Sequence, residues 1–178
     1  MNRGNPYEAA FEAYLRQQGT SYFAIDESKR NQWGLETETI KTPDFIVMTN
    51  DGSRIVVEIK GRRYPSGPAS KPRRVWENWT TREDVNGLSR WSERINGVGL
   101  FVFLYQLGES VHLPNDVPDL WSFRDERYLI RTIPVDSYRR WMRTRSPKWG
   151  TVCLPNDVYR ELVEPWSIYT TAEILWPA

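Results

Sequence analysis

Hydrophobic positions near the start of the chain recur at helical spacing and predict a first helix over residues 6–18. Asn5 is a suitable N-cap, and Pro6 fits the first helical position. Gly19 is a natural end for the helix. The apolar stripe that should face the core consists of Tyr7, Ala10, Phe11, Tyr14 and Leu15.

After this helix the spacing changes to that of strands. Residues 21–25 predict a short strand, and residues 26–33 predict a helical turn or loop. Apolar, β-branched residues then lie on both sides of the turn Asn50-Asp51-Gly52, in the segments 42–48 and 54–60. This pattern predicts an antiparallel hairpin.

A second helix and a buried strand follow the hairpin. Residues 61–79 predict a loop, because three prolines interrupt them. Thr80 and Glu83 form a capping-box pattern at the start of the next helix, and Asn96-Gly97 ends it. The nearly continuous apolar run over 98–105 predicts a strand buried on both faces. The helix should turn one stripe to the core, namely Val85, Leu88, Trp91 and Ile95.

The last third of the chain has a weaker pattern. It predicts a strand over 128–133, a helix over 135–142 and a short strand over 151–154. The pentapeptide Leu-Pro-Asn-Asp-Val occurs at 113–117 and again at 154–158, and we interpret it as a reused turn or helix-start signal. We therefore divide the chain into an α/β core, residues 1–106, and a C-terminal extension packed on it, residues 107–178, as a specificity or dimerisation element.

Composition constrains the number of domains and the cellular location more than the function. The 178 residues suit one domain, and the net charge of +1 does not by itself indicate a nucleic-acid partner. No apolar stretch approaches the length of a membrane span, and the N-terminus lacks the apolar core of a signal peptide. Cys153 is the single cysteine, which excludes an intramolecular disulfide. We expect a cytoplasmic protein with no membrane partner.

Charged residues in the predicted hairpin are the main candidates for chemistry. Side chains two apart share one face of a strand, so Glu58 and Lys60 should point the same way, opposite Ile59. Asp44 follows Pro43 at the start of the neighbouring strand, within reach of Glu58. Charged groups on an apolar strand are costly without partners. Two carboxylates and a lysine therefore predict a site for a hard cation beside a charge-stabilising ammonium.

The motif Pro43-Asp44 followed by Glu58-Ile59-Lys60 resembles that of the PD-(D/E)xK nuclease superfamily. The order helix, strand, hairpin, helix, strand matches the core of that superfamily over residues 5–105. The resemblance implies a restriction-endonuclease-like α/β fold, with three layers around a mixed central sheet. It also implies a Mg²⁺-dependent nuclease acting on DNA, with Mn²⁺ as a substitute metal.

The first helix extends the resemblance to archaeal Holliday-junction resolvases. Glu8 and Gly19 have the spacing of the glutamate and helix-ending glycine in those enzymes. The resemblance implies that Glu8, Asp44, Glu58 and the backbone carbonyl of Ile59 hold the metal, with Glu12 as the alternative to Glu8. Lys60 would orient the attacking water or offset charge in the transition state. Because related resolvases are dimers, a homodimer is also implied.

Basic residues next to the motif are candidates for contacts with DNA phosphates. Residues 60–76 carry six basic side chains and no acid, and residues 139–148 carry five more, again without an acid. Trp76 and Trp79 could stack on bases, although we favour core packing for Trp79. The predicted DNA-binding residues are Arg62, Arg63, Lys71, Arg73 and Arg74.

The sequence leaves open the pathway of the predicted nuclease and two alternatives to a nuclease. A repair or resolvase-like enzyme and a restriction or anti-phage nuclease would use the same residues, so the sequence leaves the pathway open. A non-catalytic module that binds nucleic acid or protein on the same fold would bind no metal. A small interaction protein with a tryptophan-rich binding surface would show no salt-sensitive affinity for nucleic acid.

Overall fold

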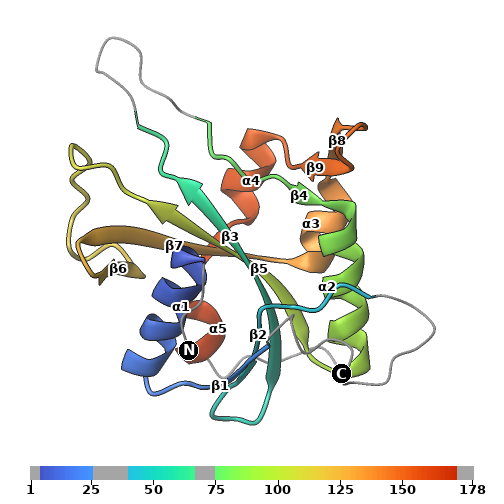
Figure 1. Cartoon of the computed structure of the whole chain (residues 1–178), viewed down its shortest axis with the longest axis horizontal. Coiled ribbons are helices and arrows are strands. Elements are labelled where there is room, and N and C mark those ends of the chain that lie inside the picture. The colour runs from blue at the N-terminus through green and yellow to red at the C-terminus, as the bar shows by residue number, and fades with distance from the viewer. Residues whose placement is uncertain (1–4, 26–39, 67–74, 172–178) are drawn as a thin grey trace.

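The computed structural model describes residues 5–25, 40–66 and 75–171. Helices and strands alternate irregularly along the chain, and the described strands form two sheets (Figure 1). The elements in chain order are α1 (Pro6–Gln17), β1 (Ser21–Ala24), β2 (Phe45–Met48), β3 (Arg54–Arg63), β4 (Thr80–Thr81), α2 (Arg82–Arg94), β5 (Val98–Gln106), β6 (Leu120–Phe123), β7 (Glu126–Pro134), α3 (Val135–Trp141), β8 (Arg143–Ser146), β9 (Thr151–Cys153), α4 (Asn156–Leu162), β10 (Glu164–Pro165) and α5 (Ile168–Thr171).

The larger sheet is mixed, as predicted. Its strand order is β1-β2-β3-β5-β7-β10, and β6 pairs with β7. Strands β3 and β5 run parallel, whereas the other neighbouring pairs are antiparallel. The chain therefore has a mixed α/β architecture with a mixed central sheet.

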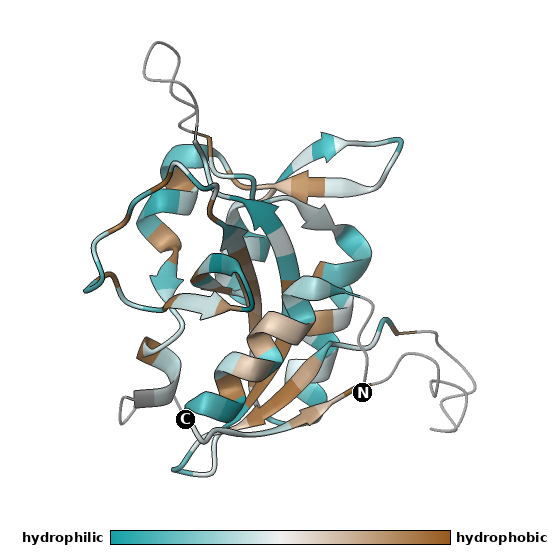
Figure 2. Ribbon diagram, turned by 60° about the vertical axis from the view of Figure 1, so that its left-hand side comes forward, coloured by the Kyte–Doolittle hydropathy of each residue, from teal (hydrophilic) through white to brown (hydrophobic). Residues whose placement is uncertain are grey.

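Strand β5 separates two hydrophobic layers. Its residues alternate between them: Leu100, Val102 and Leu104 pack with α1, while Phe101 and Phe103 pack with α2 and α3. All five are fully buried, which confirms the predicted strand buried on both faces. Hydrophobic residues concentrate on the strands of the sheet and on the helix faces that meet them (Figure 2).

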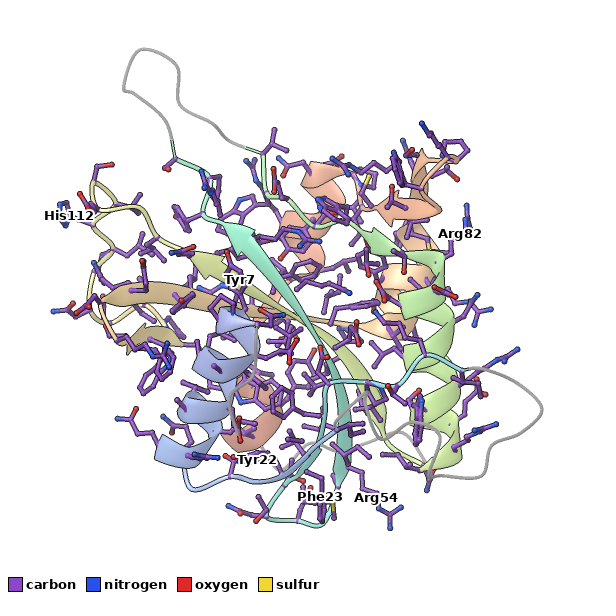
Figure 3. The ribbon with its side chains drawn as sticks, in the orientation of Figure 1. Tyr7, Tyr22, Phe23, Arg54, Arg82 and His112 are labelled. Atoms are coloured by element: carbon purple, nitrogen blue, oxygen red, sulfur yellow. The ribbon has the colours of Figure 1, made fainter. Side chains whose placement is uncertain are left out.

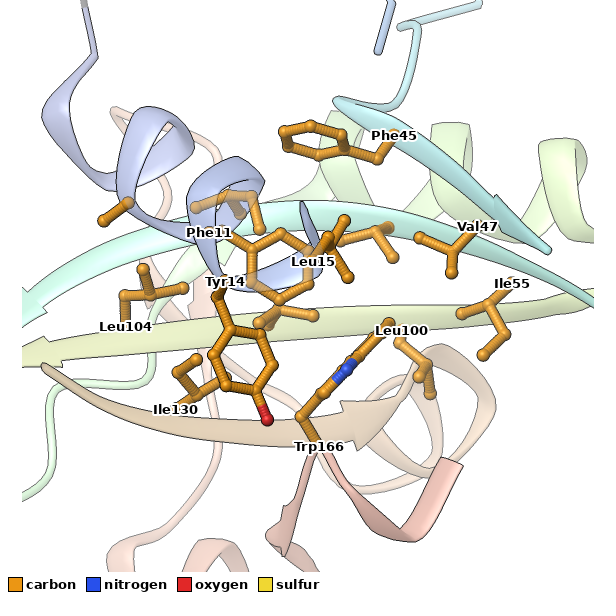
Figure 4. Packing of buried hydrophobic residues seen from close by; sticks show 14 of the residues in the cluster. Phe11, Tyr14, Leu15, Phe45, Val47, Ile55, Leu100, Leu104, Ile130 and Trp166 are labelled. Carbon is orange, nitrogen blue, oxygen red and sulfur yellow. The ribbon is translucent and has the colours of Figure 1, made fainter. Parts of the chain in front are cut away.

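The α1 side of the sheet holds an aromatic core (Figure 4). Phe11 packs edge-on against Phe45 of β2 and against Trp166, with ring centroids 5.6 and 5.0 Å apart. Ala10, Phe11, Tyr14 and Leu15 of the predicted α1 stripe are buried, and Tyr7 is partly buried against the same cluster. The N-cap at Asn5 is also confirmed, because its side chain accepts a hydrogen bond from Tyr7 N–H at 3.1 Å.

The hairpin is confirmed, including its turn. β2 and β3 pair antiparallel, and Phe45 stands opposite Val57 at one end of their register. Gly52 lies in the turn with φ of 84°, a conformation that favours glycine. β3 continues to Arg63, so the predicted loop over 61–79 begins later than expected.

The start of α2 differs from the prediction by one residue. Thr81 is the N-cap, and it forms the capping box with Asp84 rather than Thr80 with Glu83. Adjacent threonines and adjacent acids make both pairings fit the same spacing in sequence. The shift matters because it turns Asp84 towards the hairpin.

The C-terminal third contributes to both layers. β7 lies beside β5 in the main sheet, and α4 and β9 pack on the α2 side through Tyr159 and Val152. The pentapeptide acts as a helix start at Asn156 and as a turn at residues 115–116. The predicted turn at 26–33 lies outside the described residues. Among the described helices, none is long and apolar enough to cross a membrane.

Candidate metal and nuclease site

The register of the hairpin places Asp44 beside the motif residues of β3. Asp44 N–H donates to the carbonyl of Val57 at 2.9 Å, so Asp44 continues the ladder one position beyond the Phe45–Val57 pair. Its Oδ2 accepts a hydrogen bond from Ile59 N–H at 2.7 Å. Asp44 is thereby fixed against the backbone residue between Glu58 and Lys60.

The same hydrogen bond indicates where the Ile59 carbonyl points. In an antiparallel ladder the N–H and C=O of one residue face the same neighbouring strand. Because Ile59 N–H meets the Asp44 side chain where β2 begins, the carbonyl of Ile59 is directed to that side as well. A carboxylate and a backbone carbonyl are thus brought to one end of β2.

Glu58 and Lys60 lie on the face of β3 that packs against α2, as the strand period predicts. Val56 of this face belongs to the α2 core cluster, whereas Ile55, Val57 and Ile59 belong to the α1 cluster. Glu58 is only 5% exposed. Its Oε1 accepts from Lys60 Nζ at 2.9 Å, which makes an ion pair on the strand.

Two residues that were not predicted for the site complete this pair. Lys41 Nζ donates to Glu58 Oε1 at 2.8 Å and also contacts Asp84 Oδ1. Asp84 Oδ2 accepts from Lys60 Nζ at 2.8 Å and from Thr80 Oγ1 at 2.6 Å. The result is a quartet of two buried carboxylates and two partly exposed ammonium groups: Lys41, Glu58, Lys60 and Asp84.

The quartet is electrostatically matched. Burial opposes the charged form of Asp84, yet Lys60 and Lys41 hold the pKa of its carboxyl far below the usual value. Burial likewise opposes charge on Lys41, but Glu58 and Asp84 raise the pKa of its ammonium above the usual value. Lys41 and Asp84 are therefore held in their charged forms.

The pKa of the Asp44 carboxyl is shifted in the opposite direction from that of Asp84. Burial and the neighbouring Glu58 carboxylate raise the pKa of Asp44 well above its usual value, and Glu8 adds to this effect. The hydrogen bond from Ile59 and the charge of Lys60 offset only part of it. A partly buried carboxyl crowded by other carboxylates would be stabilised by a cation.

Helix α1 contributes Glu8 from the other side of the sheet. Tyr7 lies directly over β3 (Figure 3), where a Cβ on Gly61 would come within 2.1 Å of the tyrosine ring. Glu8 accepts from Asn5 Nδ2 at 2.7 Å and lies close enough to Asp44 to influence its charge. Glu12 instead pairs with Arg16 at 2.8 Å and accepts from Tyr22 Oη at 2.9 Å.

The oxygen donors suit a hard cation such as Mg²⁺, which binds carboxylates, carbonyls and waters. Within the described residues, however, no three histidine, cysteine, aspartate or glutamate side chains stand together as a ready metal cluster. Glu58 turns its Oε1 to the two lysines. The residues therefore fit the metal in chemistry, provided that Glu58 or Glu8 turns towards Asp44.

Arginine and tryptophan side chains adjoin the end of β3. The Arg62 guanidinium lies 4.0 Å from the centroid of the Trp79 ring and donates to the carbonyls of Gly61 and Trp79. Arg63 is exposed. We expected core packing for Trp79, but it is Trp76 that packs on the α2 core cluster, edge-on against Tyr105 at 4.8 Å. Of the predicted DNA-binding residues, Lys71, Arg73 and Arg74 lie outside the described residues.

Comparisons with known proteins give a partial similarity. Neither a scan against protein-family models nor a search of curated proteins found a match. Among solved structures, the chain is similar to Hjc from Archaeoglobus fulgidus, a Holliday junction resolvase from an archaeal hyperthermophile. The two share 13% identity over 90% of this chain and 95% of that one, with a TM-score of 0.48. This likeness is too low to transfer an activity.

Proposed function

We propose that the protein is a Mg²⁺-dependent nuclease of restriction-endonuclease-like fold that hydrolyses phosphodiester bonds in DNA. The observation that carries the proposal is the hydrogen bond between Asp44 Oδ2 and Ile59 N–H, 2.7 Å long. It joins the two halves of the predicted motif and sets Asp44 beside Glu58 and Lys60. A chance match of the sequence pattern would not require this contact.

The metal would be held by Asp44 and Glu58, together with the carbonyl of Ile59. Glu8 rather than Glu12 would be the helix ligand, because Glu12 already pairs with Arg16 and Tyr22. Bound Mg²⁺, or Mn²⁺ in its place, would lower the pKa of a coordinated water and neutralise charge on the phosphate. Asp44 is the anchor of this set, because Ile59 N–H fixes its Oδ2 in place and because burial and the neighbouring Glu58 carboxylate both raise the pKa of its carboxyl, an effect that a bound cation would offset.

Lys60 would act by position and charge. Its ammonium is held by Glu58 and Asp84 at 2.9 and 2.8 Å, and an ammonium donates hydrogen bonds but has no lone pair to accept a proton. Lys60 therefore orients the attacking water and offsets charge that develops on the phosphate. Asp84 is a positioning residue, because it acts through Lys60.

Phosphates beside the scissile bond would meet the basic side chains that follow Lys60. Arg63 is exposed, and Arg62 presents its guanidinium on the Trp79 ring. The sequence places Lys71, Arg73 and Arg74 on the same connection. A resolvase-like repair enzyme and a restriction or anti-phage nuclease would both use such contacts, and a homodimer would supply the two sites that paired cuts require.

One observation favours a second candidate, a non-catalytic module on the same fold. Glu58 Oε1 is engaged by both Lys41 and Lys60, in ion pairs of 2.8 and 2.9 Å. A quartet of this kind can serve as a structural link between β3 and α2 without any metal. The two candidates differ in whether hydrolysis depends on Asp44.

Cleavage of a panel of DNAs with Mg²⁺ or Mn²⁺ tests the proposal. The panel contains plasmid, linear duplex, single-stranded and branched DNA, and wild type is compared with Asp44→Asn and Lys60→Ala. Glu83→Gln is the matched control, because Glu83 is an exposed acid in the same turn as Asp84. The proposal predicts activity in wild type and the control that both site variants lose. Activity retained by Asp44→Asn, or none with any DNA, would favour the second candidate.

A further inference from the structure

A basic surface with an exposed tryptophan lies outside the proposed metal site. It consists of Arg139, Arg140, Arg143, Arg145, Lys148 and Trp149, on α3, β8 and the turn to β9. We call it the hairpin surface, after the hairpin formed by β8 and β9. In the described part of the chain, none of its five cations forms an ion pair with an acid. Trp149 is 71% exposed at the turn, far above what core packing would leave.

The hairpin surface is attached to the proposed site through the small sheet. β9 pairs with β4, where Thr80 stands opposite Val152, and the hydroxyl of Thr80 donates to Asp84. Arg82, at the start of α2, donates to Thr144 Oγ1 of β8 at 2.7 Å. In Figure 1 the β8–β9 hairpin lies beyond the same end of α2. The β8–β9 hairpin is therefore connected to the turn of α2 that carries Asp84.

Trp79 links the two basic regions. Its ring lies 4.0 Å from the Arg62 guanidinium, at the end of β3, and 5.1 Å from that of Arg145 on β8. Two guanidinium groups over one indole connect Arg62, two residues after Lys60, with Arg145 of the β8–β9 hairpin. A polyanion bound at the metal site would run along these side chains.

Trp149 adds an exposed aromatic ring to the cations of the hairpin surface. Lys148 Nζ lies 5.3 Å from the centroid of its ring, so a cation adjoins the exposed indole. A protein interface of the usual kind has an apolar centre, depleted in charges. Cations that bind phosphates around an aromatic ring that stacks on a base are instead typical of proteins that bind single-stranded nucleic acid.

We propose that the hairpin surface binds DNA beside the cleaved bond, and that Trp149 stacks on an unpaired base there. This rests on the proposed nuclease function and gives it a preferred substrate, DNA that is branched, bulged or frayed. Arg143, Arg145 and Lys148 contact the backbone on either side of that base.

The test is equilibrium binding without divalent cations, so that no DNA is cut. The probes are a continuous duplex and the same duplex with one unpaired thymine, titrated against wild type, Trp149→Ala and the double variant Arg143→Ala/Lys148→Ala. Phe23→Ala and Arg94→Ala are matched controls, because Phe23 is 66% exposed and Arg94 is exposed in the last turn of α2. In Figure 3, Phe23 lies at the lower edge of the molecule, far from Arg82 on the upper right, at the start of α2.

Trp149→Ala should weaken binding to the bulged probe by about five- to hundredfold, the range for stacking one base, and change continuous-duplex binding by about twofold or less. The double variant should weaken binding to both probes and lower the slope of log affinity against log salt by about two. Both controls should bind as wild type does.

Equal losses on both probes for Trp149→Ala, or losses matched by Phe23→Ala, would overturn the stacking proposal. Hairpin variants that keep wild-type affinity, in a protein whose cleavage depends on Asp44, would overturn the hairpin surface and leave the nuclease function intact. A wild type that neither binds nor cuts DNA would overturn both.

Discussion

At the scale of single residues, Asp84 contacts more side chains of the site than Glu58 does. It bonds Lys41, Lys60 and Thr80 and also closes the capping box of α2. A buried carboxylate that serves two ammonium groups cannot be neutralised without leaving charge uncompensated. Its removal should therefore affect both folding and the orientation of Lys60.

Asp84→Asn tests this role. The amide keeps an oxygen that can accept the hydrogen bond from Thr81 N–H, so the change removes mainly the charge. We expect a loss of about 2–4 kcal/mol in the free energy of unfolding, measured by urea denaturation. Glu83→Gln, one position earlier and exposed, should change it by about 0.5 kcal/mol or less. Equal effects of the two substitutions would show that the quartet contributes little.

The candidate site could be predicted from sequence only where the chemistry follows a local pattern. Asp44, Glu58 and Lys60 were found because a hairpin and a period of two place them together. Lys41 had no such signal, since it lies in no periodic segment and meets Glu58 only through tertiary packing. Asp84 lies in the first turn of α2, where a carboxylate complements the helix dipole, and no local pattern indicates its contacts with the lysines.

At the scale of elements, α2 holds the segment that leads into β2. The helix comes close to this segment at Gly87, where a Cβ would lie 2.8 Å from the carbonyl oxygen of Lys41. Trp91, one turn later, donates from Nε1 to the same carbonyl at 3.1 Å. The position of Lys41, and of Asp44 three residues on, therefore depends on the absence of a side chain at Gly87.

Gly87→Ala should destabilise the protein although alanine is the better helix former. In a free helix the change would stabilise by about 1 kcal/mol, whereas overpacking against backbone costs about 1–3 kcal/mol. We expect a lower midpoint of thermal unfolding. Asn86→Ala, at the exposed neighbouring position, should leave the midpoint unchanged or raise it. A higher midpoint for Gly87→Ala would contradict the close packing of α2 on the Lys41 segment.

Long elements with clear periodicity were predicted well, as were the short strands β1 and β9, whereas the other short strands outside the β2–β3 hairpin were not predicted. α1, the hairpin, α2, β5, β7 and α3 follow from runs of seven residues or more, or from a strong turn signal. β8 reads Arg-Thr-Arg-Ser and has no apolar alternation, so its pairing with β9 depends on tertiary contacts. β4, β6 and β10 have two to four residues each and carry no pattern of their own.

At the scale of the whole molecule, the C-terminal third completes the sheet that carries the site. β7 pairs with β5 from Leu100 to Gln106, and Trp166 is almost fully buried against α1. Without these contacts β5 would become an exposed, strongly hydrophobic edge strand. The division at residue 106 stays a prediction about organisation, and the structure offers a direct way to test it.

A fragment of residues 1–106 should fail to fold. It lacks β7 on one side of β5 and Trp166 under α1, so it loses partners in both core layers. We expect thermal unfolding without a cooperative transition and association through the uncovered edge of β5. The full chain, measured beside it by circular dichroism, should unfold cooperatively. A fragment with its own cooperative transition would establish residues 1–106 as an independent domain.

The central claim is that Asp44 and Glu58 form a divalent-cation centre, and binding of Mn²⁺ tests it without knowledge of the DNA substrate. Free Mn²⁺ measured by electron paramagnetic resonance, during titration with wild type, Asp44→Asn and Glu83→Gln, gives the affinity directly. A cation centre at Asp44 and Glu58 predicts that wild type and Glu83→Gln bind Mn²⁺ with similar affinity. Asp44→Asn should bind Mn²⁺ about tenfold more weakly or worse, because the anchoring carboxylate is lost. Wild type and Asp44→Asn with the same affinity, or no Mn²⁺ bound by wild type, would contradict the claim.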